Sequence, residues 1–332
     1  MIAYLDNSAT TRPSESVIAA MEESMRGGYF NPSSLYAPAL AAEKAMNACR
    51  KKIEAAISAP EGHVYFTSGG TEANNLAILG AASAFRAPGH AIVTAVEHPS
   101  VLAAYERLGE KGWRVTVLPV DKDGQPDWAA LDQALADPPA LVSCMQVNNE
   151  TGALPDIARL VKAVREKAPD ALIHVDGVQG FLRVPFDARL CDLYTLSGHK
   201  LHGPKGVGAL WVRKGVRLKP RQLGGGQEDA IRSGTENTPG IAGLRAAIET
   251  MPHDAGEITA RLKARLLAGL CEGIPGLIVN SPKTAAGHIL NVGFPRVRGE
   301  VMLHALEGEG VYASTGSACS SKKRKVSPVL LA

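Results

Sequence analysis

The sequence has little of several features that would place it in a special class of proteins. Aromatic residues make up 5% of its 332 residues, and the formal net charge is only +3. No apolar run reaches the roughly 18 residues that a membrane-spanning helix needs. The five cysteines are an odd number without a Cys-x-x-Cys pair. We therefore expect no disulfide scaffold, no zinc site, no membrane partner and no direct nucleic-acid partner.

The first residues also lack the pattern of a targeting signal. MIAYLDNSATTRP has no basic stretch followed by an apolar core. Together with the widely spaced cysteines, this favours a reducing compartment, and we expect a cytoplasmic protein. A short basic run, Lys322 to Lys325, fits a nucleic-acid or nuclear-address patch, but a solvated surface run is the commoner explanation.

What the sequence does contain is an ordinary globular composition. Hydrophobic residues make up 45% and charged residues 21% of the chain, which argues against disorder. A chain of 332 residues is long enough for two domains, or for one large domain with a smaller appendage.

Between about residues 60 and 215, short β-rich runs alternate with helical patterns. The strand-like runs are VYFTSGG, HAIVTAVEHPS, RVTVLPV, ALVSCMQVNNETG, ALIHVDGVQ, LYTLSGHK and GALWVRK. Amphipathic segments such as ARLVKAVREKA lie between several of them, with apolar residues recurring three and four positions apart. This alternation predicts an α/β fold with a largely parallel sheet and helices on both faces.

After about residue 240 the pattern changes. Two helical stretches, GIAGLRAAIETM and AGEITARLKARLLAGL, precede the strand candidates LIVNS and HILNVGF and the helix EVMLHALEGEG. This order predicts a second, smaller α+β domain. We place the large domain at residues 14–250 and the small domain at residues 1–13 and 251–332.

Polar residues gather where the predicted strands end, which is where parallel sheets bind ligands. TSGGTEANN follows one strand and opens a helix, so Gly70 and Thr71 offer a backbone N–H and a hydroxyl to an anion such as phosphate. A plain capped helix would give the same pattern. Asp176 ends a buried strand, where its carboxylate requires a cation or an N–H donor, and a simple salt bridge would meet that need.

The next strand-like run delivers Ser197, His199 and Lys200 to the same edge. A phosphate cradle, a strand-end aspartate and a neighbouring lysine are the groups that pyridoxal 5'-phosphate (PLP) requires for its phosphate, its ring nitrogen and its Schiff base. Each group alone is weak evidence, but together they predict a PLP enzyme. His98, at a further strand end, suits stacking on the ring and proton transfer, although a lone histidine is more often structural.

The sequence also carries a series of motifs in the order found in one enzyme family: DNSATT, NPSS, FTSGGTEANN, EHPSV, NNETG, HVDGVQ, SGHKLHGPKGVGAL, RSGTEN and GSACSS. Over essentially its whole length the chain resembles the cysteine desulfurases of the NifS/IscS type, which are fold-type I PLP enzymes of the class V aminotransferase group. The resemblance implies conversion of L-cysteine to L-alanine, with the sulfur left as a persulfide on an enzyme cysteine.

The resemblance also implies roles for individual residues. Lys200 would form the Schiff base, Cys319 would take the sulfur, and His98 would stack on the ring. The other cofactor-site residues would be Gly70, Thr71, Asn149, Asp176, Gln179, Ser197 and His199, with Asp176 at the ring nitrogen, Gln179 at the phenolic oxygen and Asn149 orienting substrate. Thr235, in RSGTEN, would reach the phosphate of the neighbouring subunit, which implies a homodimer.

Cys319 lies in the run ASTGSACSS, where no large apolar residue can anchor it. A nucleophile that must reach the substrate sulfur and then an external acceptor is served better by such a segment than by a rigid core. We hypothesise that Lys322 to Lys325 lower the pKa of this thiol or attract an acidic partner. We expect the other cysteines, Cys49, Cys144, Cys191 and Cys271, to be small core residues.

Two features depart from the family pattern. Thirteen residues follow Cys319 (332 minus 319), so we expect a C-terminally shortened small domain without the arginine that binds the substrate carboxylate in the family. Tyr36 stands where the family usually has histidine, near the entrance of the site.

Three functions are consistent with these residues. The first is a cysteine desulfurase that delivers sulfur to an acceptor protein, either an iron–sulfur scaffold or a tRNA thiolation protein. The second is a selenocysteine lyase or another PLP lyase, which would share every cofactor contact. The third is a catalytically weak pseudoenzyme that binds PLP and acts as a dimeric partner without making alanine.

Overall fold

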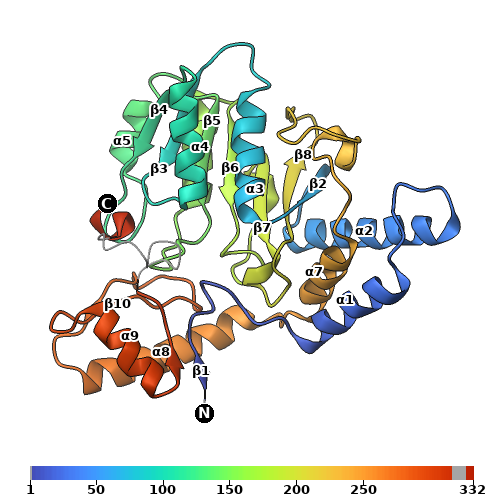
Figure 1. Ribbon diagram of the computed structural model, residues 1–332. Helices are drawn as coiled ribbons and strands as arrows, with labels where there is room; N and C mark the ends of the chain where they lie inside the picture. The colour runs from blue at the N-terminus through green and yellow to red at the C-terminus, as the bar shows by residue number, and fades with distance from the viewer. Residues whose placement is uncertain (1, 316–326) are drawn as a thin grey trace.

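The structure is a computed structural model that describes residues 2–315 and 327–332 of the chain (Figure 1). A large sheet with its helices forms the upper part of Figure 1, and we call its strands and their connections, residues 62–213, the sheet region. Residues 255–315 and 327–332, which we call the C-terminal segment, lie mostly below it.

Seven strands form the central sheet, in the order β2-β8-β7-β6-β5-β3-β4. They are β2 (Gly62–Thr67), β3 (His90–Thr94), β4 (Arg114–Leu118), β5 (Leu141–Met145), β6 (Leu172–Asp176), β7 (Leu193–Ser197) and β8 (Gly208–Arg213). Every neighbouring pair is parallel except the two that β8 makes with β2 and β7. The prediction of a largely parallel α/β sheet is confirmed.

The antiparallel strand β8 has a simple physical cause. Residues 198–207 connect it to β7, and this connection is shorter than the dozen or so residues that a parallel crossover requires. The chain therefore returns directly beside β7, in the register Ser197 to Gly208.

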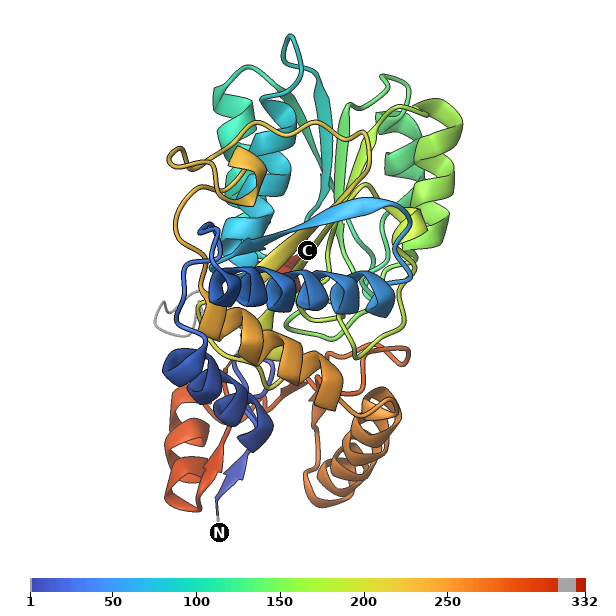
Figure 2. The ribbon, with the colours of Figure 1, turned by 90° about the vertical axis from the view of Figure 1, so that its right-hand side faces the viewer.

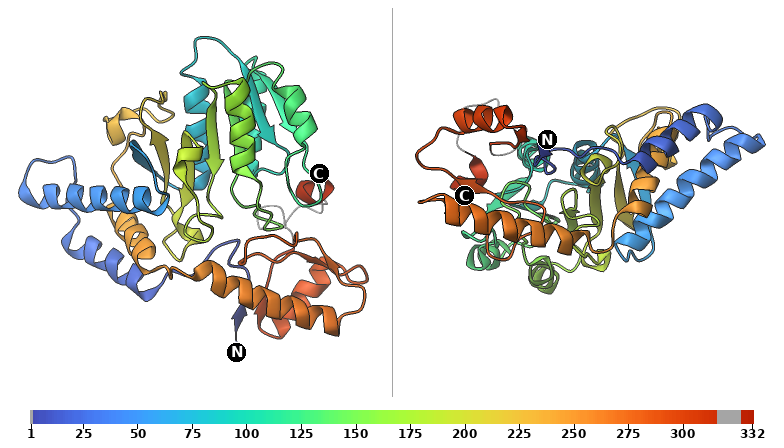
Figure 3. Two further views of the ribbon diagram at one scale, coloured as in Figure 1. Left: turned by 180° about the vertical axis from the view of Figure 1, so that it is seen from behind. Right: turned by 90° about the horizontal axis from the view of Figure 1, so that it is seen from below.

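Helices cover the sheet on both faces (Figures 1 and 3). One face packs against α2 (Ala37–Ala56), α6 (Ile157–Lys167) and α7 (Thr238–Thr250) in the largest apolar cluster. The other face packs against α4 (Pro99–Glu110) and against α3 (Gly70–Asn75) with its π-helical extension Leu76–Gly80. Because both faces are covered, strands β3, β5 and β7 are buried along their whole length.

Helix α6 shows how the sequence encodes this packing. Asp156 caps its N-terminus by accepting a hydrogen bond from the Arg159 amide. The residues Ile157, Leu160, Val161 and Val164 are buried, and their spacing of three and four places them on one face. Two further α-helices precede the C-terminal segment. They are α1 (Glu15–Gly27), which lies beside α7 in Figure 2, and α5 (Trp128–Ala134).

The C-terminal segment contains the elements that its pattern predicts, which are α8 (Ala255–Gly273), β9 (Ile278–Val279), β10 (Val292–Gly293) and α9 (Gly299–Gly308), and β9 pairs with β10. It also contains two elements that were not predicted, β11 (Val311–Tyr312) and α10 (Pro328–Leu331). Strand β1 (Ala3–Tyr4) pairs in parallel with β11. This pairing supports the proposal that residues 1–13 belong with the small domain, whose boundaries stay a prediction.

The cysteines only partly follow expectation. Cys49, Cys144 and Cys191 are buried, as predicted, but Cys271 is exposed, so its assignment to the core is wrong. The reason is that α8, which carries Cys271, buries only Ala255. None of the helices in the part of the chain that the structure describes is both long and apolar enough to cross a bilayer.

Candidate functional site

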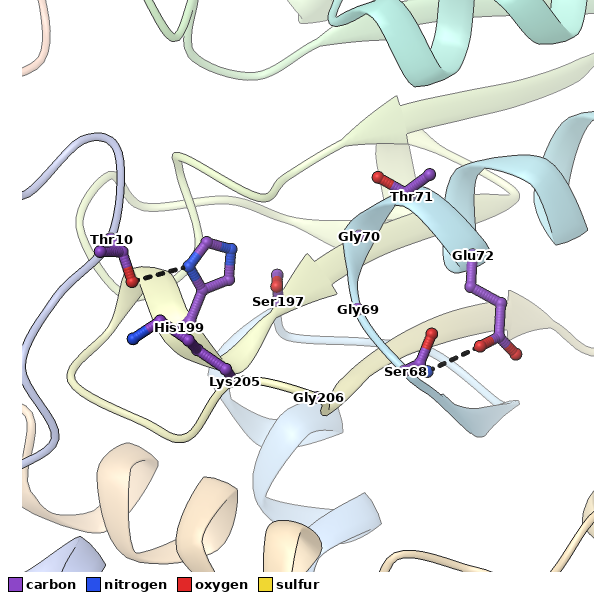
Figure 4. Close-up of a pocket in the computed structure, with 10 residues that line it drawn as sticks. All are labelled: Thr10, Ser68, Gly69, Gly70, Thr71, Glu72, Ser197, His199, Lys205 and Gly206. Atoms are coloured by element: carbon purple, nitrogen blue, oxygen red, sulfur yellow. Dashed lines mark hydrogen bonds between the residues drawn. The ribbon is translucent and has the colours of Figure 1, made fainter. Parts of the chain in front are cut away.

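A cavity of about 340 Å³ lies where strands β2 and β7 end (Figure 4). The residues that line it are Thr10, Ser68, Gly69, Gly70, Thr71, Glu72, Ser197, His199, Lys205 and Gly206. Four of the predicted cofactor residues, Gly70, Thr71, Ser197 and His199, are therefore brought together here. The hydroxyls, imidazole and ammonium group of this lining are donors suited to a phosphate.

Glycine is required where the backbone passes the cavity. Gly69 has φ +153°, a conformation that side-chain-bearing residues rarely adopt. A Cβ at Gly70 would stand 2.6 Å from Val178 Cγ2, and one at Gly208 would stand 2.7 Å from Gly69 Cα. The turn between β2 and α3 can thus lie against β8 only as long as these positions carry no side chain.

Glu72 holds this turn in place. Its Oε2 accepts a hydrogen bond from the Ser68 amide at 2.9 Å, drawn in Figure 4, and its Oε1 accepts one from Arg232 Nε at 2.7 Å. Burial raises the pKa of this carboxyl, but hydrogen bonds from Arg232 and Ser68 outweigh that effect and leave the pKa below its usual value. Glu72 is therefore ionised, and its charge is used in holding the turn through Arg232 and Ser68.

His199 borders the cavity as a neutral ring. Its Nδ1 lies 3.1 Å from Thr10 Oγ1 (Figure 4), and its carbonyl accepts from the Thr11 amide at 2.9 Å. Burial, together with the charges of Lys200 and Lys205, lowers its pKa to about 4. At neutral pH the ring contributes hydrogen bonds, while Lys205 carries positive charge at this end of the cavity.

Asp176 is buried at the end of β6, and two N–H donors meet its carboxylate. Asn74 Nδ2 donates to Oδ2 at 2.7 Å, and the Val178 amide donates to Oδ1 at 3.0 Å. The sequence left open whether a cation or N–H groups would satisfy this aspartate, and the structure shows N–H groups. The same Asn74 amide also reaches Ser100 Oγ at 3.0 Å, which ties the aspartate to the start of α4.

His98 precedes α4 and caps it. The Ser100 amide donates to His98 Nδ1 at 3.1 Å, so the proton of a neutral ring lies on Nε2. Burial lowers the pKa of this imidazole, with the Asp176 charge opposing that shift and the Lys200 charge adding to it. His98 is therefore a neutral imidazole at this edge of the sheet, as ring stacking would require.

Lys200 lies in the short turn Gly198–Lys200 after β7, and the N-terminal chain passes over it. Its ammonium group donates to the carbonyls of Ser8 at 2.5 Å and Ala9 at 2.8 Å. Gln179 Nε2 donates to the same Ser8 carbonyl at 2.8 Å, while Gln179 Oε1 is buried with no partner within the described chain. The motif DNSATT thus supplies the carbonyl groups that position the lysine and the glutamine.

Three predicted site residues are not shown at the site. Asn149 is half-buried in the loop after β5, where its neighbour Asn148 makes the structural hydrogen bonds to Val96, Glu150 and Thr151. Thr235 is exposed and is not among the residues that line the cavity of its own chain. Cys319, like Lys322 to Lys325, lies outside the described residues.

Sequence reasoning missed Ser68, Glu72 and Lys205. Ser68 and Glu72 stand inside FTSGGTEANN, and Lys205 stands inside GPKGVGAL, so the motifs themselves were the available signal. What the motifs do not display is the contact with Arg232, which lies 160 positions from Glu72.

Comparison with known proteins identifies close relatives. The profile of the Aminotransferase class-V family matches residues 3–330. Cysteine desulfurase 2 of Trichormus variabilis is 40% identical over 336 aligned positions, which cover 100% of this chain and 84% of that protein. A solved structure described as a NifS-like protein matches with a TM-score of 0.91 and 34% identity, covering 99% of this chain and 89% of that one. SspA in complex with cysteine matches with a TM-score of 0.87 and 31% identity, covering 99% and 93%.

Proposed function

Since the chain belongs to the aminotransferase class-V family, we propose that it is a PLP-dependent cysteine desulfurase, which converts L-cysteine to L-alanine and retains the sulfur as a persulfide. The observation that carries the proposal is the placement of Lys200, Asp176 and the anion cavity at one edge of the sheet. These are the lysine, ring-nitrogen and phosphate sites that PLP needs.

The cavity and its surroundings fit this cofactor in charge and in shape. Thr71, Ser197 and Lys205 offer donors to a phosphate, and the bare backbone of Gly69 and Gly70 lets the group approach. Gln179 Oε1, a buried acceptor to which none of the described residues donates, suits a protonated oxygen of the ring. When bound, PLP supplies an electron sink for bonds at the α-carbon of an amino acid.

The protein's own residues supply positioning and proton transfer. The carbonyls of Ser8 and Ala9 fix the Lys200 amine at the strand end, where it can attack an aldehyde and later hold a proton. Asp176, whose carboxylate is fixed by two N–H donors, would hold a protonated ring nitrogen. The neutral ring of His98 can stack on an aromatic ligand and exchange a proton at Nε2.

Cys319 is our proposed nucleophile. Its thiolate would form a bond to the substrate sulfur as the bond between that sulfur and the β-carbon breaks, which leaves a persulfide on the enzyme. The electron pair of the broken bond stays with the β-carbon, which takes up a proton to become the methyl group of alanine. SspA, which shares this fold, has been solved with cysteine bound, in keeping with an L-cysteine substrate here. We propose that an acceptor protein, an iron–sulfur scaffold or a tRNA thiolation protein, then receives the sulfur, in the cytoplasm.

We also propose a homodimer. Large apolar side chains are exposed on the loop between α1 and α2 and on the long loop that follows β8: Tyr29 at 68%, Leu35 at 92% and Leu223 at 82%. We propose that the second subunit covers these side chains. Thr235 belongs to the same exposed loop region, which supports its proposed reach into a neighbouring subunit.

The test is alanine formation by the PLP-loaded protein given L-cysteine under reducing conditions. We expect alanine and sulfide in equal amounts, and none from Lys200→Ala. Turnover of selenocysteine but not cysteine would make the protein a selenocysteine lyase. Bound cofactor without alanine would identify a pseudoenzyme, and either result would contradict the proposal.

A further inference from the structure

Glu97 is a buried carboxyl group that the proposed chemistry leaves unused. It directly precedes His98 and is only 2% exposed. Among the described residues, no lysine, arginine or histidine forms an ion pair with it; the ion pairs of the buried Glu228 with Arg50 and of Asp192 with Arg165 show the usual alternative. A buried carboxylate without a cation is costly unless several donors surround it.

The hydrogen bonds of Glu97 are asymmetric. Oε1 accepts from Thr94 Oγ1 at 2.5 Å and from the Met145 amide at 2.6 Å. Oε2 is buried and has no partner in the described chain. An oxygen without a partner costs less as the hydroxyl of a neutral carboxylic acid than as half of an ionised carboxylate, which would need donors at both oxygens, so this asymmetry favours the neutral form with its proton on Oε2.

A second carboxyl group lies one strand away. Met145, whose amide donates to Glu97, is paired in register with Asp176 across β5 and β6. Asp176 differs from Glu97 in that both of its oxygens receive N–H donors. Two buried carboxyls this close together disfavour double ionisation, and the one with donors on both oxygens takes the charge.

We propose that Glu97 is a neutral carboxylic acid with its proton on Oε2, so that the Glu97–Asp176 pair carries one negative charge, located on Asp176. Glu97 is then a positioning residue: it bonds β3 to β5 without placing a second charge beneath the ring-nitrogen site. Its role toward that nitrogen rests on the proposed function, but the location of the proton does not.

The other groups around Glu97 agree with this assignment. Burial raises the pKa of Glu97 to about 8, with the charge of Asp176 adding to the shift and the hydrogen bonds from Thr94 and Met145 opposing it. Cys144 on β5 and Tyr105 on α4 lie near Glu97, and burial raises the pKa of both, so both stay neutral at pH 7 and neither places a charge beside Glu97.

The test is infrared difference spectroscopy of the cofactor-free protein at pH 7, comparing the wild type with Glu97→Gln. We expect the wild type to show the C=O stretch of a protonated carboxyl group and Glu97→Gln to lack it. Glu61→Gln, which removes an exposed carboxylate paired with Lys214, should leave that band unchanged. Loss of carboxylate bands instead of the C=O band in Glu97→Gln would overturn the proposal.

Two further readouts cover the remaining outcomes. If Glu97→Gln does not fold, the wild-type spectrum at pH 7 decides alone, because the absence of any C=O band of a protonated carboxyl group would overturn the proposal. In PLP-loaded protein with a ¹⁵N-labelled ring, Glu97→Gln should keep the protonated signal at pH 7, while Asp176→Asn should lose it. A changed signal in Glu97→Gln would contradict a neutral Glu97. Failure of PLP to bind would count against the proposed function alone.

Discussion

The sheet region and the C-terminal segment differ in how much side-chain surface they bury. In the sheet region, β3, β5 and β7 are buried along their whole length. In the C-terminal segment, α9 has no buried residue, and Leu262 and Leu266 of α8 are 59% and 41% exposed. The tight packing of the sheet region fixes the positions of the candidate site residues, because the lysine, the aspartate and the anion cavity all belong to that region.

The two regions make contact next to the site. Val147, Ala286 and Ile289 form an apolar cluster, and Asn291 Nδ2 donates to the Glu150 carbonyl at 3.1 Å. Ser327 Oγ donates to Glu150 Oε2 at 2.5 Å. The C-terminal segment is thus attached to the NNETG loop after β5, beside the predicted substrate residue Asn149.

The largest expected effect is the loss of alanine formation when a bond-forming residue is removed. Lys200→Ala and Cys319→Ala should each lower alanine formation by at least about 1,000-fold, because each removes a group that forms a bond during the reaction. Only Lys200→Ala should also change the visible absorption of bound PLP. Spectra and alanine assays on both variants check this, and an unchanged turnover in Cys319→Ala would show that Cys319 is not the nucleophile.

The second effect compares the two regions in stability. Leu210→Ala, at a fully buried position of β8, should lower the free energy of unfolding by about 2–5 kcal/mol. Leu262→Ala, at a 59% exposed position of α8, should change it by less than about 1 kcal/mol. Urea denaturation measures both. Equal losses would show that α8 is packed against something that the isolated chain does not display.

A third prediction concerns the loop that braces the cavity. Arg232→Met removes the partner of Glu72, and we expect PLP to bind about tenfold more weakly, since a hydrogen bond between charged groups contributes about 1.5 kcal/mol. Arg26→Met, which breaks an exposed ion pair with Glu22, is the matched control and should leave PLP affinity unchanged. Titration of cofactor-free protein with PLP gives both constants.

The smallest effect is a pH dependence of stability. Burial lowers the pKa of His174 to about 4 from its usual 6.5. Because the unfolded chain then binds this proton more readily than the folded protein, stability is lost as the pH falls from about 6.5 toward 4. His174→Asn should flatten this part of the melting-temperature profile, whereas His304→Asn, at an exposed position, should not. Parallel profiles for all three proteins would contradict the assignment.

Much of the sheet and part of the site could be predicted from the sequence. The strands could be recognised because buried parallel strands are short apolar segments. Asp176 and Lys200 could be recognised because Asp176 ends β6 and Lys200 lies in the turn that follows β7. The contact between Lys200 and Ser8 could not be recognised, since 192 positions separate the two residues and nothing local marks a backbone carbonyl as a lysine partner. The neutral state that we propose for Glu97 could not be predicted for a similar reason, because it depends on burial and on the charge of Asp176, which is distant in the sequence.

The exposure of Cys271 shows the limit of reading helices by composition. Its neighbours along α8 are apolar enough to suggest a core helix, yet burial depends on what the other elements place against that face. In the sheet region, the apolar face of a helix such as α6 packs against the strands of the sheet. In the C-terminal segment the sequence pattern alone cannot supply such a partner.

The central claim is that the lysine at the end of β7 holds the cofactor. The most direct test is to load the protein with PLP, reduce the complex with borohydride and map the modified peptide by mass spectrometry. We expect the mass of the reduced cofactor on the peptide with Lys200 modified. We expect none on Lys205, which lines the same cavity five positions away (205 minus 200). Modification of Lys205, or of any lysine other than Lys200, would contradict it.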